Sequence, residues 1–374
     1  IYTALPSYGS ATLFSVPGTK NNSELVPERT KSYEIGLEMN FLKNRLGFDL
    51  TYYDAKSVNQ ILPVAVSTAT GYDYEYINAG VIQNKGWEVS LNLTPVKTQN
   101  FQWDVRLNFT KNNNKVLSLF GPDSSAVLQL GSFQGGVSVN AVPGEAYGQI
   151  RGKDFVYTNG ERTVKANGYY AITSTSNNVI GNATPDWLGG INNMIRYKNL
   201  SLSFLIDIRQ GGDVFSLDSY YGYATGLYDF TAGKNDLGND LRDHVADGGG
   251  VILPGVTADG KANTTRVNGD VGGGTLFGIY GYYRNPAKAF VYDASYVKLR
   301  EVTLNFSLPK SFIERTKIFQ GIDVSVFGRN LWIINKNMPY SDPEDLLSSG
   351  NIQGYQSGAY PAVRSIGANL KFKF

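Results

Sequence analysis

The sequence contains no cysteine and a single histidine, His244. Without cysteine, the chain forms neither disulfide bonds nor the thiolate zinc sites that stabilise many small folds. The motifs G-x-S-x-G and H-E-x-x-H and the P-loop are also missing. His244 lies among the acidic residues of 240–247, where we interpret it as a solvated loop residue. We therefore expect no catalytic residue, no cofactor-binding motif and no enzyme activity.

Long apolar runs are equally absent. The longest apolar runs are short, for example Phe204–Ile206. A membrane-spanning helix needs about 20 mostly apolar residues, so any segment that crosses a membrane must be a strand. Charged residues make up 18%, whereas soluble domains have roughly 25%. Aromatic residues reach 13% and glycine numbers 42 residues. Because the net charge is only +2, no basic face is implied, and we expect no nucleic-acid partner.

What the sequence does contain is a series of segments in which apolar and polar residues alternate. The last one, 362–374, is the plainest. Its apolar residues share one face of an extended chain and its polar residues share the other. The apolar face comprises Ile366, Ala368, Leu370, Phe372 and Phe374. At the edge of a soluble sheet such a row invites pairing with other chains, whereas in a closed barrel it faces lipid.

Three hairpins repeat this pattern. Their strands are expected at 31–41 with 46–53, at 87–93 with 101–109, and at 187–197 with 200–208. Further strands are expected at 294–308, 321–329 and 362–374, with a weaker one near 147–156 and a helical turn within 309–316. The long connections are 57–85, 112–185 and 210–288. Short turns on one side and long loops on the other are typical of outer-membrane barrels.

These segments predict an all-β fold, a transmembrane antiparallel β-barrel of about ten strands with long extracellular loops. Residues 1–30, rich in Ser, Thr, Pro, Gly and Asn, are expected to form an extracellular loop segment, and 31–374 to form the barrel. A soluble antiparallel sandwich or propeller is the alternative. Charges opposite the apolar face in hairpin after hairpin favour a solvated lumen, which we expect to be lined by Asp49, Glu88, Asp104 and Arg106.

Tyrosines gather in the predicted extracellular loops. A phenol ring with its hydroxyl group suits stacking on a sugar, burial against a partner protein, or packing within the loops, and all three interpretations stay open. The candidate contact residues are Tyr72, Tyr74, Tyr76, Tyr220, Tyr221, Tyr223, Tyr280, Tyr282 and Tyr283.

Two acidic stretches, 236–247 and 342–345, contain the carboxylates that Ca²⁺ prefers. Neither stretch has the spacing D-x-[DN]-x-[DN]-G of an EF-hand loop. We therefore expect ordinary solvated loops without a metal ion, and a loop Ca²⁺ site is the less favoured alternative.

Several phrases resemble the SusC/RagA family of TonB-dependent outer-membrane transporters from Bacteroidetes. The first phrase, 24–38, reads ELVPERTKSYEIGLE and leads into NRLGFDLTYY at 44–53. Later phrases, in the family's order, are NAG at 78–80, NKGWE at 84–88, TPDWLGG at 184–190, RQGGD at 209–213, DASYVKLR at 293–300 and GRNL at 328–331. Each phrase alone is weak, but together they are specific and extend from about residue 24 to the C-terminus.

The resemblance implies a 22-stranded barrel around a plug, of which this chain is the C-terminal portion of about ten strands. The plug and the early strands are expected to lie outside this sequence, since two unpaired edges in lipid are untenable. The implied partners are a SusD-like surface lipoprotein that opens and closes like a lid, TonB, which would act through the N-terminal part, the remaining barrel and plug, and outer-membrane lipid.

The implied function is active import of an oligomeric nutrient, a glycan or a peptide, across the outer membrane. The alternatives are a structural or docking barrel without transport and a passive porin, which would lack both plug and lid.

Overall fold

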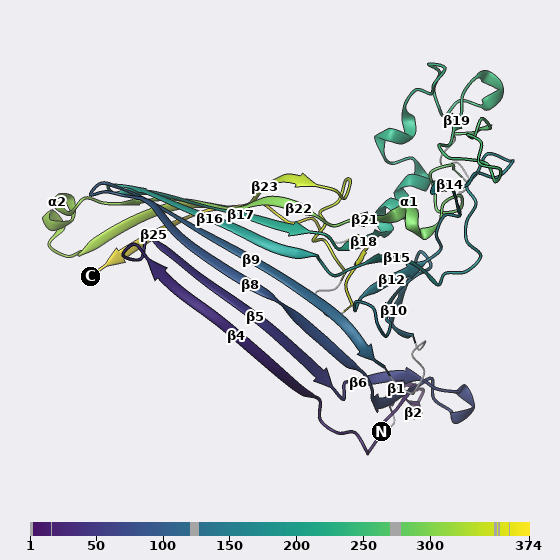
Figure 1. The fold of residues 1–374 in the computed structure, drawn as a ribbon, viewed down its shortest axis with the longest axis horizontal. Helices are drawn as coiled ribbons and strands as arrows, with labels where there is room; N and C mark the ends of the chain where they lie inside the picture. Colours follow the sequence, from purple (N-terminus) through teal and green to yellow (C-terminus); the bar gives the residue numbers. More distant parts are fainter. Residues whose placement is uncertain are drawn as a thin grey trace.

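The computed structural model describes residues 3–15, 17–119, 127–269, 278–347, 350, 352–358 and 360–374. Its dominant element is a nine-stranded antiparallel sheet, in which long strands lie side by side and a folded lobe lies at one end (Figure 1). The sheet order is β25-β23-β22-β17-β16-β9-β8-β5-β4. The strands are β4 (Arg29–Phe41), β5 (Leu46–Val58), β8 (Val81–Lys97), β9 (Phe101–Ser118), β16 (Trp187–Tyr197), β17 (Leu200–Gln210), β22 (Tyr296–Ser307), β23 (Gly321–Lys336) and β25 (Ser365–Lys373).

The pairing register places the predicted apolar residues on one face across the whole sheet. One row runs through Leu37, Leu50, Val89 and Phe109 on β4, β5, β8 and β9. At the other edge, Leu202 pairs with Leu304, Leu304 with Val326, and Val326 with Ala368. Many of these side chains are strongly exposed, for example Ile35 at 75% and Ile366 at 80%. The all-β prediction and the strand alternation that led to it are confirmed.

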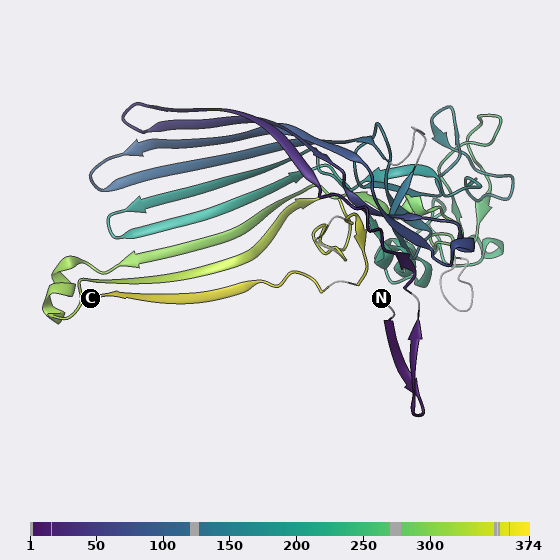
Figure 2. The same ribbon diagram turned by 90° about the horizontal axis from the view of Figure 1, so that it is seen from below.

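Short turns join these strands at one end of the sheet. The three predicted hairpins are present, with turns at 42–45, 98–100 and 198–199. The expected helical turn after β22 is also present, as α2 (Lys310–Ile313) followed by a 3₁₀ turn at Glu314–Thr316. The long connections all leave from the opposite end, where they build the lobe (Figure 2).

The strand count and several strand ends differ from the sequence-based expectation. The sheet has nine strands, and the weak tenth strand becomes β12 (Gln149–Gly152) in a separate four-stranded sheet. β8 begins at Val81 and β9 ends at Ser118, well outside the apolar segments. These extensions carry polar residues, whose backbone groups still form ladder hydrogen bonds. Apolar periodicity marks only the part of a strand that faces an apolar medium.

Most of the described residues of 112–185 lie outside strands, as expected, but this connection also contains a folded sheet that the sequence did not predict. β10 (Leu128–Phe133), β11 (Val137–Ala141), β12 and β15 (Asn178–Asn182) form the four-stranded sheet. Shorter pieces are β3 (Thr19–Lys20), β6 (Ile61–Ala65), β7 (Tyr74–Asn78), β13 (Tyr157–Thr158), β14 (Glu161–Arg162), β18 (Asp213–Ser216), β19 (Val251–Ile252), β20 (Arg266–Val267), β21 (Val291–Asp293) and β24 (Tyr355–Gln356), with 3₁₀ turns at Thr68–Thr70, Asp229–Ala232, Val245–Asp247 and Ala287–Phe290.

One helix, α1 (Leu217–Thr225), follows β18 in the lobe. Its N-terminus is capped by the Ser216 hydroxyl, which accepts a hydrogen bond from the backbone N–H of Ser219 at 3.1 Å. It ends at Gly226, whose φ of 72° is the left-handed conformation that glycine adopts easily.

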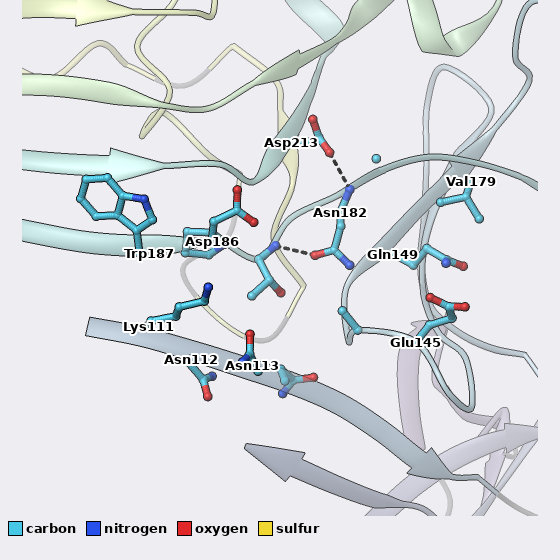
Figure 3. Close-up of a pocket in the computed structure, with 15 residues that line it drawn as sticks. Lys111, Asn112, Asn113, Glu145, Gln149, Val179, Asn182, Asp186, Trp187 and Asp213 are labelled. Atoms are coloured by element: carbon cyan, nitrogen blue, oxygen red, sulfur yellow. Dashed lines mark hydrogen bonds between the residues drawn. The ribbon is translucent and has the colours of Figure 1, made fainter. Parts of the chain in front are cut away.

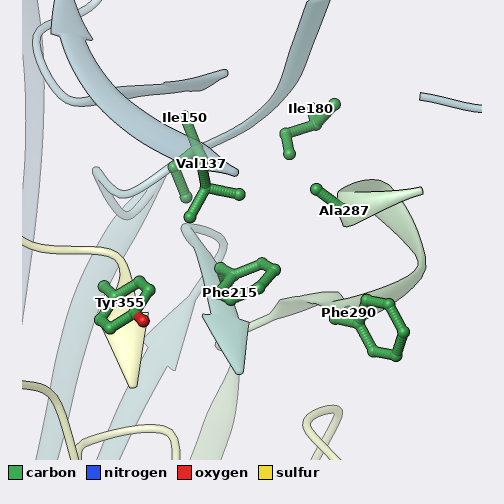
Figure 4. Close-up of a cluster of buried hydrophobic side chains, with 7 residues drawn as sticks. All are labelled: Val137, Ile150, Ile180, Phe215, Ala287, Phe290 and Tyr355. Carbon is green, nitrogen blue, oxygen red and sulfur yellow. The ribbon is translucent and has the colours of Figure 1, made fainter. Parts of the chain in front are cut away.

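A buried apolar cluster joins the parts of the lobe (Figure 4). Its members are Val137, Ile150, Ile180, Phe215, Ala287, Phe290 and Tyr355, which come from segments far apart in the sequence. Phe215 and Phe290 are fully buried, with ring centroids 6.4 Å apart. The lobe therefore has its own core at the end of the sheet.

The segment 1–30 is not entirely loop. β1 (Thr3–Tyr8) and β2 (Ala11–Ser15) form a hairpin, and β4 begins already at Arg29. Residues 1, 2 and 16 of this predicted segment lie outside the described residues. This strand pair was not predicted because the segment is rich in Ser, Pro and Gly and its strands lack strict alternation of apolar and polar residues. Among the described residues, no helix has the length and apolar character needed to span a membrane.

Candidate functional site

A cavity of about 720 Å³, here called the large cavity, lies where the sheet meets the lobe (Figure 3). It exists because β9 continues to Ser118 after its last pairing with β16, between Thr110 and Leu188. At that point β16 begins, and the preceding chain turns away into the lobe. The notch between the two segments is lined by Lys111, Asn112, Asn113, Asn114, Glu145, Ala146, Gln149, Val179, Gly181, Asn182, Thr184, Pro185, Asp186, Trp187 and Asp213.

The cavity wall is dominated by amides and carboxylates. Asn182 is fixed at two points: its backbone N–H donates to Asp213 Oδ2 at 2.8 Å, and its side-chain Oδ1 accepts from Thr184 N at 2.7 Å. Burial raises the pKa of Asp213, although the Asn182 hydrogen bond acts in the opposite direction. Glu145, Asp186 and Lys111 add charge of both signs. Such a wall binds hydroxyl and amide groups by hydrogen bonds and presents no nucleophile paired with a base.

A second cavity of about 350 Å³ shares part of this wall. Asn112, Asn114, Thr184 and Pro185 line both cavities, and Tyr147 and Gly148 extend the lining toward the lobe. The Thr184 hydroxyl donates to the Tyr147 carbonyl oxygen at 3.0 Å, which holds the turn before β16 against the lobe. The two cavities therefore share part of one wall at the lobe end of the sheet.

Six of the nine predicted contact tyrosines lie in the connection between β17 and β22. Tyr220 stacks on Tyr282 with ring centroids 4.5 Å apart, and Tyr221 meets Tyr282 edge-on at 5.4 Å. Burial raises the pKa of Tyr220 to about 12, so its hydroxyl remains protonated at neutral pH. Tyr220, Tyr282 and Tyr283 line a further cavity of about 490 Å³. These four tyrosines form one aromatic cluster, here called the tyrosine cluster, comprising Tyr220, Tyr221, Tyr282 and Tyr283.

The other candidate tyrosines do not join the tyrosine cluster. Tyr223 forms a hydrogen bond of 2.7 Å with the hydroxyl of Tyr292, and Tyr280 packs edge-on against Phe230 at 5.1 Å. Tyr74 and Tyr76 lie on β7, in the small sheet with β3 and β6, and Tyr72 lies in the turn before it. The predicted tyrosines therefore separate into a group of three between β5 and β8 and a group of six between β17 and β22.

The four predicted lumen residues share the face opposite the apolar rows. Asp49 pairs with Ser90, Glu88 with Thr51, Asp104 with Met194, and Arg106 with Asn92. Asp104 accepts hydrogen bonds from Thr94 Oγ1 at 2.7 Å and from Gln102 Nε2 at 2.7 Å. Their assignment to a lumen remains a prediction, and none of the four lines the large cavity.

Sequence reasoning did not anticipate an ionic cluster that ties a loop to this polar face. Lys298 Nζ lies 2.5 Å from Asp342 and 2.6 Å from Glu344, and Lys298 is only 4% exposed. Arg300 contacts Glu344 and lies 2.7 Å from Asp207. Burial acts to raise the pKa of Glu344, but hydrogen bonds from Arg300 and Lys298 lower it to about 2. We call Lys298, Arg300, Asp342 and Glu344 the acidic clamp.

The clamp explains one of the two acidic stretches. Asp342 and Glu344 neutralise strand cations and are thus engaged within the protein. In the other stretch, Asp236 lies 2.6 Å from Arg266 and Asp240 lies 2.8 Å from Lys234. The His244 ring accepts a hydrogen bond from the Ala246 backbone N–H at 3.3 Å. No group of three or more potential ligand side chains that could hold a metal ion occurs within the described residues.

The cavity was missed because it is built from four separate segments, of which 112–114 and 182–187 are adjacent only through the sheet register. A usable signal was the run Lys111–Lys115, five polar residues directly after the apolar strand. The pairing of Asp342 and Glu344 with Lys298 had no periodic signal, because loop positions follow no fixed spacing relative to strands.

The family model and the relatives found by comparison with known proteins are all TonB-dependent receptors. Residues 3–153 match the family model described as TonB dependent receptor-like, beta-barrel. The chain is 28% identical over 380 residues to TonB-dependent receptor P26 of Formosa agariphila, covering 96% of this chain and 36% of that protein. It is 24% identical to TonB-dependent receptor SusC of Bacteroides thetaiotaomicron, covering 94% of this chain and 32% of that protein. The chain thus spans about a third of the length of these relatives.

Among solved structures, the chain is similar in fold to the RagAB peptide transporter. The TM-score is 0.69 at 19% identity, and the match covers 100% of this chain and 38% of the other. The open-open state of the RagAB peptide importer matches with a TM-score of 0.67 at 18% identity.

Proposed function

We propose that this chain is part of a SusC-related TonB-dependent receptor of the outer membrane, where its β-barrel strands form part of an active importer and not of an enzyme. The cargo of this importer is an oligomeric nutrient, a glycan or a peptide. The chain supplies barrel strands and extracellular loops, and transport through them requires no covalent chemistry and no cofactor.

The observation that carries the proposal is the division of the sheet into two faces, together with the position of the lobe. One face presents continuous apolar rows, as a lipid-facing wall requires, and the other presents charged and amide side chains, as a solvated passage requires. The large cavity lies where the sheet meets the lobe, and its lining takes residues from both faces of the sheet, Asn112 and Asn114 as well as Lys111 and Trp187. Amide and carboxylate groups there fit the hydroxyl groups of a glycan as well as the backbone amides of a peptide.

The proposed partners follow from the same arrangement. A SusD-like lipoprotein would cover the lobe, and TonB would supply energy through the plug portion of the full-length protein. The tyrosine cluster is the proposed contact for the nutrient or for the lipoprotein. Its stacked rings offer flat, partly exposed apolar surface with hydroxyl groups at the edge.

The proposal is tested with the full-length protein in its native outer membrane. We expect a strain without the gene to lose uptake of one class of fluorescent oligomer, either oligosaccharides or peptides. We also expect wild-type uptake to stop when an uncoupler removes the proton motive force. The purified protein should bring a surface lipoprotein with it.

Two outcomes would replace the proposal. Uptake that continues after uncoupling, together with solute flux in proteoliposomes, would identify a passive porin. Unchanged uptake of both oligomer classes in the deletion strain, with stable association to other envelope proteins, would identify a docking protein.

A further inference from the structure

Five lysines lie close together on the apolar-row face of the sheet, at the lobe end of β4, β5, β8 and β9. They are Lys31, Lys56, Lys85, Lys111 and Lys115. The register defines their positions: Lys111 pairs with Trp87, Lys115 and Lys56 both pair with Gln83, and Lys31 pairs with Lys56. The period of two along each strand places all five side chains on the same side as Trp87. We call these five residues the lysine surface.

The lysine surface is small and dense. Alternate residues on a strand are about 7 Å apart and neighbouring strands about 4.8 Å apart, so the five side chains originate within a patch of roughly 14 Å by 14 Å. The charges are not balanced within the sheet. Lys31 and Lys56 are directly opposite each other, an arrangement of like charges that destabilises a strand pair.

All five lysines are exposed, and none forms an ion pair with another part of the chain among the residues that the structure describes. The nearby carboxylate, Asp54, pairs across the strands with Lys85 in register, but its oxygens accept hydrogen bonds from Gln83 Nε2, both at 2.8 Å. Buried Lys298, by contrast, has two carboxylate partners. The lysine surface therefore lacks the counterions that the chain supplies elsewhere.

Its position relative to the apolar rows indicates the counterion. On β9, Lys111 is the next residue on the same face after Phe109, which belongs to the apolar row that crosses β4, β5, β8 and β9. On β8, Lys85 is the residue on the same face before Trp87. Tyr52 and Trp87 pack together at 4.8 Å, as the aromatic residues of a membrane interface do. The lysine surface thus begins where the apolar band ends, at the height of lipid headgroups. A long lysine side chain can lie along apolar surface while its ammonium group reaches a headgroup.

The surface is confined to one part of the sheet. In the row of Lys111, the next positions on β16 and β17 are Trp187 and Gln210, which carry no positive charge. The lysines at this end of the sheet are therefore gathered on β4, β5, β8 and β9 and do not continue onto β16 and β17, which favours a ligand held at that part of the sheet.

We propose that the lysine surface binds the phosphate groups of an anionic lipid in the outer leaflet, with the acyl chains against the adjoining apolar rows. Ammonium groups facing outward from the barrel wall meet phosphate at this height, and several such contacts add up. A covering lipoprotein would instead sit over the lobe, at the end of the strands. This inference rests on the membrane orientation and not on the transported cargo.

The experiment uses full-length protein in detergent and a variant in which all five lysines are replaced by glutamine. The matched control replaces five exposed lysines at the short-turn end by glutamine: Lys43, Lys97, Lys198, Lys310 and Lys317. Each variant loses the same charge. Binding is measured by native mass spectrometry with bisphosphorylated lipid A and with its dephosphorylated form.

We expect the wild-type protein and the control to retain the phosphorylated lipid. The lipid-bound fraction of the five-glutamine variant should be at least roughly tenfold lower. A five-arginine variant should restore binding, because it restores the charge. Heat-modifiability on gels verifies that each barrel is folded, and a variant that fails to fold is replaced by the Lys31→Gln/Lys56→Gln double variant, which leaves the cavity lining unchanged.

Equal binding by the five-glutamine variant and the wild-type protein would overturn the inference. So would equal binding of the dephosphorylated lipid, which would mean that acyl contacts alone hold it. Loss of a copurified lipoprotein with unchanged lipid binding would identify a protein-docking surface instead. Uptake of the oligomeric nutrient is recorded in parallel with a four-lysine variant that keeps Lys111, because Lys111 also lines the large cavity, so that failure of the proposed function is seen separately.

Discussion

At the scale of single residues, the face on which a side chain lies decides its tolerance of substitution. Phe204 lies on the apolar face, opposite Asn193 and Val302, whereas its neighbour Ser203 lies on the polar face opposite Met194 and Thr303. We expect Phe204→Lys to lower the free energy of unfolding in lipid by about 2–4 kcal/mol, because a charge near the membrane midplane is poorly solvated. Ser203→Lys should change it little.

The measurement is the folding equilibrium of the full-length protein in lipid vesicles with added denaturant. Ser203→Lys is the matched control, since it adds the same side chain one residue away. Equal losses for both variants would contradict the assigned strand phase.

Tyr282 makes the second residue-scale prediction. Its ring stacks on Tyr220 and lines the cavity of about 490 Å³. Since an aromatic pair contributes about 0.5–1.5 kcal/mol beyond burial, we expect Tyr282→Ala to reduce uptake of the oligomeric nutrient roughly two- to tenfold. The measurement is uptake kinetics in cells that contain equal amounts of folded protein.

The amount of copurified lipoprotein distinguishes the two proposed contacts of Tyr282. A constant amount with a raised KM for uptake indicates nutrient contact, and a reduced amount indicates lid contact. If Tyr282→Ala changes neither quantity, the tyrosine cluster serves loop packing alone.

How far the sequence determines a residue's role depends on whether a period governs its position. Asp49, Glu88, Asp104 and Arg106 were placed on one face by alternation alone, and the register agrees with that placement. Asn182 and Asp213 were not identified, since they lie at the ends of the short lobe strands β15 and β18, where no periodic pattern marks them. Partners such as Lys298 and Glu344 are 46 residues apart, and no local rule joins them.

At the scale of elements, the acidic clamp fixes the connection between β23 and β25 to the sheet. The unfolded pKa of Glu344 is near 4.5 and the folded pKa is about 2. Because the folded value is depressed, the ionised carboxylate stabilises the docked loop fully above about pH 4.5, and this contribution is lost as the pH falls toward 2. The loop should therefore stay fully docked from neutral pH down to about pH 4.5 and loosen as the pH falls from there toward 2.

A spin label at Leu347→Cys reports this behaviour, since Leu347 is exposed and the chain has no other cysteine. We expect an unchanged spectrum from neutral pH down to about 4.5 and increasing mobility below it. In Glu344→Gln, mobility should already be high at neutral pH. A label that becomes mobile between neutral pH and pH 5 would mean that another group controls docking.

The elements themselves were predictable where one of their faces meets an apolar medium. All three hairpins appear with the expected turns, whereas the ends of β8 and β9 and the sheet β10-β11-β12-β15 were missed. In the lobe, burial depends on contacts among distant segments such as Phe215 and Tyr355, whose rings stack at 5.6 Å. Such contacts leave no periodic signature in either segment.

At the scale of the whole molecule, the free sides of β4 and β25 determine what the chain can do by itself. Each of these strands has one neighbour within the described sheet. In lipid, an unpaired strand edge leaves backbone N–H and C=O groups without partners, and each such group costs several kcal/mol. We therefore propose that further strands of the full-length protein pair with both edges and close the barrel.

This closure predicts different behaviour for two lengths of the same protein. Refolded in detergent, the full-length protein should migrate as a compact species on gels and shift on boiling, as closed barrels do. Residues 1–374 alone should show no shift, because two open edges cannot be satisfied in an apolar medium. Adding the separately produced remainder during refolding should restore the shift if strand pairing at β4 and β25 is what closes the barrel. A heat-modifiable monomer formed by residues 1–374 alone would mean that β4 pairs directly with β25, and the wall would then be a small closed barrel too narrow for a plug and an oligomeric cargo.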